Sequence, residues 1–109
     1  MIIFDKGRYD ELYSELRTLA YELEPWFDID KVKSYSVYVW YRPTEEDLKH
    51  PNYPGDEFGW NVFDIYADHL QFYRCDWPWR LPNEAMPIIK KIQDKLMEIE
   101  NYIGGLTNE

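Results

Sequence analysis

The sequence predicts an α+β two-layer sandwich, in which a three-stranded antiparallel sheet carries two helices on one face. Two stretches with helical periodicity stand near the ends of the chain, and three stretches rich in β-branched and aromatic residues lie between them. The resulting order is α-β-β-β-α, and elements that are apolar on one side bury that side in a shared core. With 109 residues and no repeat or linker, residues 1–109 are expected to form a single domain.

The first expected helix runs from Tyr9 to Leu23, and Pro25 ends it. Its apolar residues follow the i, i+3, i+4, i+7 spacing that lines one face of a helix. The last expected helix begins near Asn83, an N-cap residue, and ends at Ile103 before Gly104-Gly105. Its apolar residues form a similar stripe, so both helices are expected to cover the sheet.

Three strands are expected between these helices. Residues 32–42 (VKSYSVYVWYR) alternate with period two, and residues 43–59, with three prolines and two glycines, are expected to form a long loop. Residues 60–67 and 70–75 are expected to pair as a hairpin around the two-residue turn Asp68-His69, which sets residue 65 opposite residue 72. The expected core comprises Leu12, Leu16, Leu19, Val37, Val39, Phe63, Ile65, Phe72, Ile92, Leu96 and Ile99.

Strand alternation also predicts which side chains face away from the helices. With Tyr35, Val37 and Val39 inward, the outward residues of the three strands include Tyr38, Trp40, Arg42, Val62, Asp64, Tyr66 and Tyr73. Tyr and Trp are stiff side chains with one polar end, and they are enriched in binding surfaces. We therefore expect an open aromatic sheet face that contacts a partner. Cover by the long loop, or by a second copy of the chain in a homodimer, is the alternative.

The chain is strongly acidic, with twelve basic and twenty-one acidic residues and a formal charge of −9. Such a field repels nucleic acid and anionic membranes and attracts basic proteins, so no direct contact with nucleic acid or a membrane is expected. The single cysteine, Cys75, cannot form an internal disulfide, and the first residues show no signal peptide. These features predict a cytoplasmic protein.

The acidic residues gather in the first helix and the long loop. Glu11, Glu15 and Glu22 fall along one stripe of the helix, and no lysine four residues on relieves Glu11 or Glu15. The loop adds Glu45, Glu46, Asp47, Asp56 and Glu57. The last helix interleaves acids with lysines, which is typical of a solvated face. The acidic half is therefore expected to meet positive charge.

Catalytic and metal-binding motifs are absent from the sequence. The serines have no neighbouring histidine, the glycines read as turns, and His50, His69 and Cys75 lack the spacing of a metal site. Asp64, Asp68 and His69 would make a metal-nuclease cluster only if Asp68-His69 were not the hairpin turn. We expect no enzymatic activity, metal or cofactor.

The α-β-β-β-α order resembles that of the double-stranded-RNA-binding domain. That family grips phosphates through a basic cluster at the start of its last helix. Here this position reads NEAMPIIKK, with Lys90-Lys91 a turn or two late, so RNA binding is disfavoured. In size, charge and element order the chain looks like the small acidic proteins that phages use against host defence, such as anti-CRISPR and anti-restriction proteins. This likeness implies an inhibitor that occupies the nucleic-acid groove of a basic enzyme.

The segment CDWPWRLP, residues 75–82, carries two further aromatic candidates. Pro78 stiffens it, so Trp77 and Trp79 point in different directions and either cap the core or extend the aromatic face. The sequence thus favours an acidic inhibitor that binds a basic protein through these aromatic residues and the carboxylates. An immunity protein for a nuclease toxin, a secretion chaperone or adaptor holding a peptide on the aromatic face, and a small-molecule binder remain alternatives.

Overall fold

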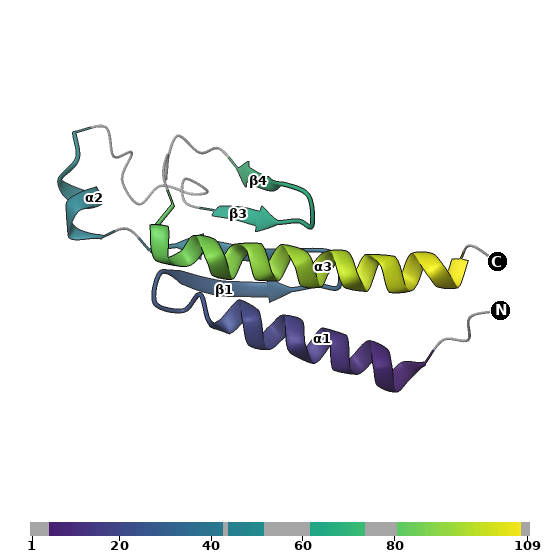
Figure 1. Cartoon of the computed structure of the whole chain (residues 1–109). Coiled ribbons are helices and arrows are strands. Elements are labelled where there is room, and N and C mark those ends of the chain that lie inside the picture. Colours follow the sequence, from purple (N-terminus) through teal and green to yellow (C-terminus); the bar gives the residue numbers. More distant parts are fainter. Residues whose placement is uncertain (1–4, 43, 52–61, 74–80, 108–109) are drawn as a thin grey trace.

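The computed structural model of the chain describes residues 5–42, 44–51, 62–73 and 81–107 (Figure 1). Within these ranges the elements follow in the order α-β-β-α-β-β-α, with a short 3-10 turn, η1, before the last helix. The elements are α1 (Lys6–Tyr21), β1 (Phe27–Val32), β2 (Val37–Tyr41), α2 (Glu45–Lys49), β3 (Val62–Ile65), β4 (Leu70–Tyr73), η1 (Asn83–Ala85) and α3 (Met86–Thr107).

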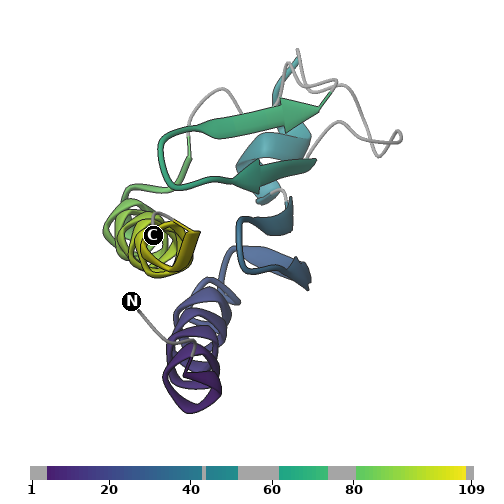
Figure 2. The ribbon, with the colours of Figure 1, turned by 90° about the vertical axis from the view of Figure 1, so that its right-hand side faces the viewer.

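The strands form one antiparallel sheet in the order β1-β2-β3-β4, and α1 and α3 lie on the same face of it (Figures 1 and 2). The predicted α+β class is confirmed. The prediction of three strands in the order α-β-β-β-α is wrong, because β1 and α2 were both missed. α2 lies beyond one end of the sheet (Figure 1).

β1 escaped prediction because its alternation is interrupted. Phe27 and Ile29 face the core, but a bulge between Ile29 and Lys31 shifts the register, so the next inward residue is Val32. The single strand expected over residues 32–42 is instead the end of β1, a turn and β2. The turn is closed by the Lys33 N–H donating to the Ser36 carbonyl over 2.8 Å. Tyr35, predicted to point inward, lies in this turn and is 61% exposed.

α2 lies within the stretch that the sequence analysis assigned to a loop. It begins with a capping box: the Thr44 hydroxyl accepts from the Asp47 N–H over 3.1 Å, and the Asp47 carboxylate accepts from the Thr44 N–H over 2.8 Å. This reciprocal pair satisfies two donors at the start of a helix. The Thr44-x-x-Asp47 spacing could have been recognised in the sequence. Pro43 and residues 52–59 of the expected loop, and residues 60–61 of the strand expected after it, lie outside the described ranges.

The β3–β4 hairpin forms with a register two residues from the predicted one. Ile65 pairs with Leu70 and Phe63 with Phe72, and the turn covers residues 66–69 rather than two residues. An even shift leaves every side chain on its predicted face. Phe72 nevertheless is 37% exposed rather than buried, because β4 is the edge strand and its ring packs on Phe63 at the margin of the core.

The core lies between the two long helices and the sheet. Nine of the eleven predicted core residues are fully buried, namely Leu12, Leu16, Val37, Val39, Phe63, Ile65, Ile92, Leu96 and Ile99. Leu19 is only partly buried and Phe72 is exposed. Phe27 adds an aromatic cluster that the sequence analysis missed, with ring centroids 5.6 Å from Tyr41 and 5.5 Å from Phe63. Each such buried side chain stabilises the fold by roughly 1.5–3 kcal/mol.

The first long helix begins before its predicted start and ends two residues before its predicted end, and the last one extends past its predicted end. α1 begins at Lys6, where the Asp5 carboxylate caps it by accepting from the Arg8 N–H over 3.2 Å. α3 continues through Gly104-Gly105 to Thr107 instead of ending at Ile103. The Tyr102 hydroxyl near the end of α3 binds the backbone of Asp5 before α1. It accepts from the Asp5 N–H over 2.8 Å and donates to the Asp5 carbonyl over 3.2 Å. The contact links the end of α3 to the start of α1.

Candidate protein-interaction surface

The acidic stripe expected on α1 is neutralised by cations. Arg8 binds Glu11 at 2.8 Å, and Lys95 of α3 contacts Glu15 and lies 2.9 Å from Glu98. The prediction that Glu11 and Glu15 are unrelieved is therefore wrong. It considered only partners four residues further along the helix, whereas Arg8 lies three residues before Glu11 and Lys95 comes from another helix.

The Lys95 cluster also shifts two protonation equilibria. The hydrogen bond from Lys95 holds the pKa of the Glu15 carboxyl below its ordinary value. The same hydrogen bond, with a second one to Glu98, raises the pKa of Lys95 despite the opposing effect of burial. These carboxylates hold the two long helices together, so they are poor candidates for binding a partner.

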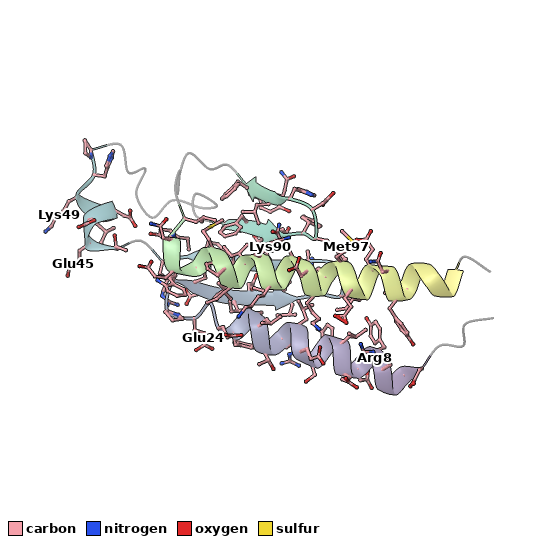
Figure 3. All side chains as sticks on the ribbon, viewed as in Figure 1. Arg8, Glu24, Glu45, Lys49, Lys90 and Met97 are labelled. Atoms are coloured by element: carbon pink, nitrogen blue, oxygen red, sulfur yellow. The ribbon has the colours of Figure 1, made fainter. Side chains whose placement is uncertain are left out.

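Four other carboxylates form the surface that we call the acidic end: Glu22, Glu24, Glu45 and Glu46. All four are exposed, and within the described ranges none of them forms an ion pair. Figure 3 places Glu24 and Glu45 at the same end of the molecule. Glu22 follows α1 directly, and Glu45 and Glu46 stand in the first turn of α2.

Arg42 fixes the backbone of the acidic end. Its N–H donates to the Trp26 carbonyl over 3.0 Å, which joins the segment before β1 to the segment after β2. Its guanidinium donates to the carbonyls of Phe27 and Glu24 and contacts the Asp28 carboxylate at 2.6 Å. One side chain thus holds the stretch carrying Glu24 against the stretch leading into α2.

Asp47, predicted as a binding residue, has a structural role in the fold. Besides capping α2, its carboxylate accepts from the Tyr41 hydroxyl over 2.7 Å, so it ties the short helix to the sheet. Of the acids expected in the loop, Glu45 and Glu46 remain exposed. Asp56 and Glu57 lie outside the described residues.

The sheet face turned away from α1 and α3, here called the far face, carries Tyr38, Trp40 and Tyr73 on its described strands. Tyr38 of β2 stands opposite Asp64 of β3, and Tyr73 of β4 stands opposite Val62. The rings of Tyr38 and Tyr73 meet with centroids 5.9 Å apart. Since β3 runs between β2 and β4, these rings can meet only over β3. Trp40 is 38% exposed and Tyr73 37%.

Asp64 lies beneath this aromatic layer. It is only 4% exposed, and its Oδ2 accepts from the Tyr73 hydroxyl over 2.5 Å, while no described residue hydrogen-bonds to its Oδ1. The hydrogen bond raises the pKa of Tyr73 above its ordinary value, with a smaller contribution from burial. Val62 is buried as well. Both residues were predicted to point outward and do so, yet both are buried, with the Tyr73 hydroxyl over Asp64.

Tyr66 interacts with Tyr73 of the far face and also contacts the β3–β4 turn. It lies in the β3–β4 turn, where its ring stacks on His69 with centroids 4.7 Å apart, and His69 Nδ1 lies 2.6 Å from the Asp68 carboxylate. Asp64 does not join this pair, and the described residues contain no group of ligands able to hold a metal ion. Trp77, Trp79 and Cys75 lie outside the described ranges.

The acidic end and the far face meet where β2 ends. Trp40 is the penultimate residue of β2 and pairs with Asp28 of β1, next to the segment that Arg42 holds. α2 follows four residues after β2, so Glu45 and Glu46 lie close to Trp40 along the chain. Exposed carboxylates therefore adjoin exposed aromatic rings at one end of the elongated molecule.

Comparisons with known protein families, with curated proteins and with solved structures each find no match. Of the helices in the described part of the chain, none combines the length and the apolar composition needed to cross a membrane.

Proposed function

We propose that the chain is a small acidic protein that binds a basic, nucleic-acid-handling protein and inhibits it. The observation that carries this proposal is the contrast between two sets of carboxylates. Glu11 and Glu15 on α1 are neutralised by Arg8 and Lys95. The acidic end has no such partner among the described residues, which leaves its negative potential free to attract positive charge.

The rigid backbone of the acidic end supports the proposal that its carboxylates occupy a site that normally binds nucleic acid. The Arg42 contacts and the Thr44–Asp47 capping box hold the two acidic segments before any partner arrives. A backbone fixed in this way loses little conformational entropy on binding, so more of the interaction energy contributes to affinity. A surface lined with lysines or arginines that normally bind phosphates is the complementary partner.

The aromatic far face supplies the second part of the binding surface. Trp40 and Tyr73 expose ring surface beside the acidic end. Charge chiefly accelerates association and is screened by salt, whereas buried aromatic anchors slow dissociation and tolerate salt. A protein that must remain bound at physiological ionic strength benefits from both.

The proposal is tested by capture of partners from host lysate on the immobilised chain at low and high salt, followed by competition with DNA or RNA. A basic partner that nucleic acid displaces supports it, provided that the purified chain then inhibits that partner's nucleic-acid-dependent activity. If the host yields only acidic or hydrophobic partners that respond to neither salt nor nucleic acid, the proposal fails. That result would favour the peptide-holding chaperone.

A further inference from the structure

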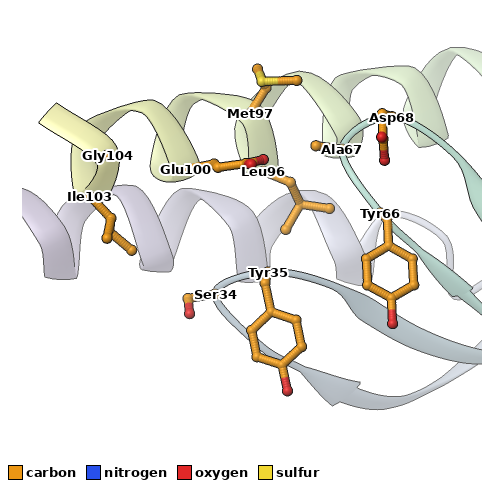
Figure 4. A pocket seen from close by; sticks show the side chains of 10 residues that line it. All are labelled: Ser34, Tyr35, Tyr66, Ala67, Asp68, Leu96, Met97, Glu100, Ile103 and Gly104. Atoms are coloured by element: carbon orange, nitrogen blue, oxygen red, sulfur yellow. The ribbon is translucent and has the colours of Figure 1, made fainter. Parts of the chain in front are cut away.

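A groove of about 550 Å³ lies at the other end of the sheet from the acidic end (Figure 4). One wall is the β1–β2 turn with Tyr35, and another is the β3–β4 turn with Tyr66 and Asp68. The third is the C-terminal half of α3, which runs past the turns of the sheet (Figure 1). The function proposed above leaves this groove unused.

The α3 wall is a single helical stripe. Leu96, Glu100, Ile103 and Gly104 stand at i, i+4, i+7 and i+8, so all four face the same side of the helix. Ile103 is exposed, because no strand extends far enough to cover it. The stripe therefore offers apolar surface with one carboxylate in its middle.

The groove is negatively charged as well as apolar. Asp68 and Glu100 both line it, and no lysine, arginine or histidine is among its described lining residues. Asp68 is paired with His69, whereas Glu100 forms no ion pair with any described residue. Tyr35 already attracts one cation, since the Lys33 ammonium lies 5.5 Å from its ring centroid.

We propose that this groove binds a small organic cation with an apolar body, such as a protonated arylalkyl amine. The ammonium group pairs with Glu100, and the apolar body lies against Ile103 and the ring of Tyr66. The volume of the groove falls within the range of about 300–1,000 Å³ that is usual for small-molecule sites. The groove and the acidic end occupy opposite ends of the sheet, so this site does not depend on the function proposed above.

The test compares three probes with one apolar body: phenylbutylamine, phenylbutanol and phenylbutyrate. Each is titrated into the full chain at neutral pH while backbone amide NMR signals are followed. We expect the shifts to concentrate at the two turns and the α3 stripe, with the amine binding about three to ten times more tightly than the alcohol. The carboxylate should bind most weakly.

Two variants locate the site and the charge. A Cβ at Gly104 would meet no heavy atom within 4 Å, so the side chain of Gly104→Leu extends into the groove without a clash. This variant should weaken the binding of both the amine and the alcohol more than about tenfold. Gly104→Ala is the matched control and should bind nearly as the original chain does. Glu100→Gln should remove the preference for the amine while leaving the affinity for the alcohol unchanged. Thermal unfolding verifies that each variant is folded.

Three results would overturn the proposal. Equal affinity for the three probes would show that charge plays no part in recognition. Shifts centred away from the groove, or unaffected by Gly104→Leu, would show that the site is wrongly placed. Absence of shifts with every probe would show that the groove takes no ligand of this class.

Discussion

The Tyr73 hydroxyl of β4 donates a 2.5 Å hydrogen bond to the Asp64 carboxylate of β3, beneath the ring contact between Tyr73 and Tyr38. A carboxylate in the middle of the far face is thereby withdrawn from the surface. The far face exposes aromatic rings, whereas the acidic end carries exposed carboxylates that have no ion pair among the described residues. This division between apolar and charged surface underlies the function proposed for the chain.

Replacing Tyr73 should destabilise the fold. Tyr73→Phe removes the one described donor to a carboxylate that is 4% exposed, and an unsatisfied buried group costs about 1–3 kcal/mol. The free energy of unfolding in urea measures this loss. Adding Asp64→Val should recover most of it, because the buried charge is then gone as well. If Tyr73→Phe unfolds within about 0.5 kcal/mol of the original chain, the hydrogen bond contributes little.

The same hydrogen bond predicts how Tyr73 titrates. Its pKa is raised in the folded state above the ordinary value of 10.0, so the folded chain binds this proton more tightly than the unfolded chain. The contribution of this hydrogen bond to the free energy of unfolding is present below pH 10.0. It is lost as the pH rises through the pKa of Tyr73 in the folded chain. Ultraviolet titration of tyrosinate should show one phenol ionising after the exposed tyrosines, and Tyr73→Phe should lack that phase. A late phase that persists in the variant would assign it to another tyrosine.

The cluster of Glu15, Lys95 and Glu98 predicts a dependence on acid. The pKa of Glu15 is lowered in the folded state. Its contribution to the free energy of unfolding is therefore present above the ordinary pKa of 4.5 and is lost as the pH falls through the pKa of Glu15 in the folded chain. Lys95→Met should cost about 1 kcal/mol at neutral pH and much less once the carboxyl groups are protonated.

Urea unfolding at neutral and acid pH measures this difference. The matched control is Lys90→Met, which removes a lysine paired with Asp94 on the exposed side of the same helix. Such an exposed pair contributes only a few tenths of a kcal/mol. Equal losses in the two variants, or a loss in Lys95→Met that acid does not reduce, would contradict the role assigned to the cluster.

Much of this fold could be predicted because its pattern is local. Helical spacing identified Leu12, Leu16, Ile92 and Leu96 as core residues. Alternation gave the correct face for the paired residues of β3 and β4 that the structure describes, despite a register error of two. An even register error leaves the faces unchanged. These predictions required no knowledge of how the elements pack.

The predictions were wrong where contacts between elements distant in the sequence determine the structure. The bulge in β1 broke the alternation, and the edge position of β4 left Phe72 exposed. Lys95 neutralises Glu15 from a position 80 residues away, which no local charge pattern reveals. Because Glu11 and Glu15 are paired, the candidate acidic surface is the acidic end rather than the α1 stripe.

Trp40 should anchor the complex with a captured partner. Its ring is 38% exposed beside the acidic end, and tryptophan is among the residues that most often dominate binding energy. Trp40→Ala should chiefly raise the dissociation rate and weaken binding by about 2 kcal/mol, or roughly thirtyfold. Surface plasmon resonance separates the two rate constants. Tyr35→Ala, an exposed aromatic residue in the β1–β2 turn at the other end of the sheet, serves as the control and should leave both rates unchanged.

The most direct test of the account is the association rate of a captured partner measured over a range of ionic strengths. Glu45→Lys with Glu46→Lys should lower this rate at low salt by about tenfold or more and flatten its salt dependence. The control, Asp10→Lys with Asp94→Lys, changes the net charge equally but alters carboxylates that are paired on the two long helices. Its rate should stay close to that of the original chain. Equal rates and equal salt dependence in both double variants would contradict the assignment of binding to the acidic end.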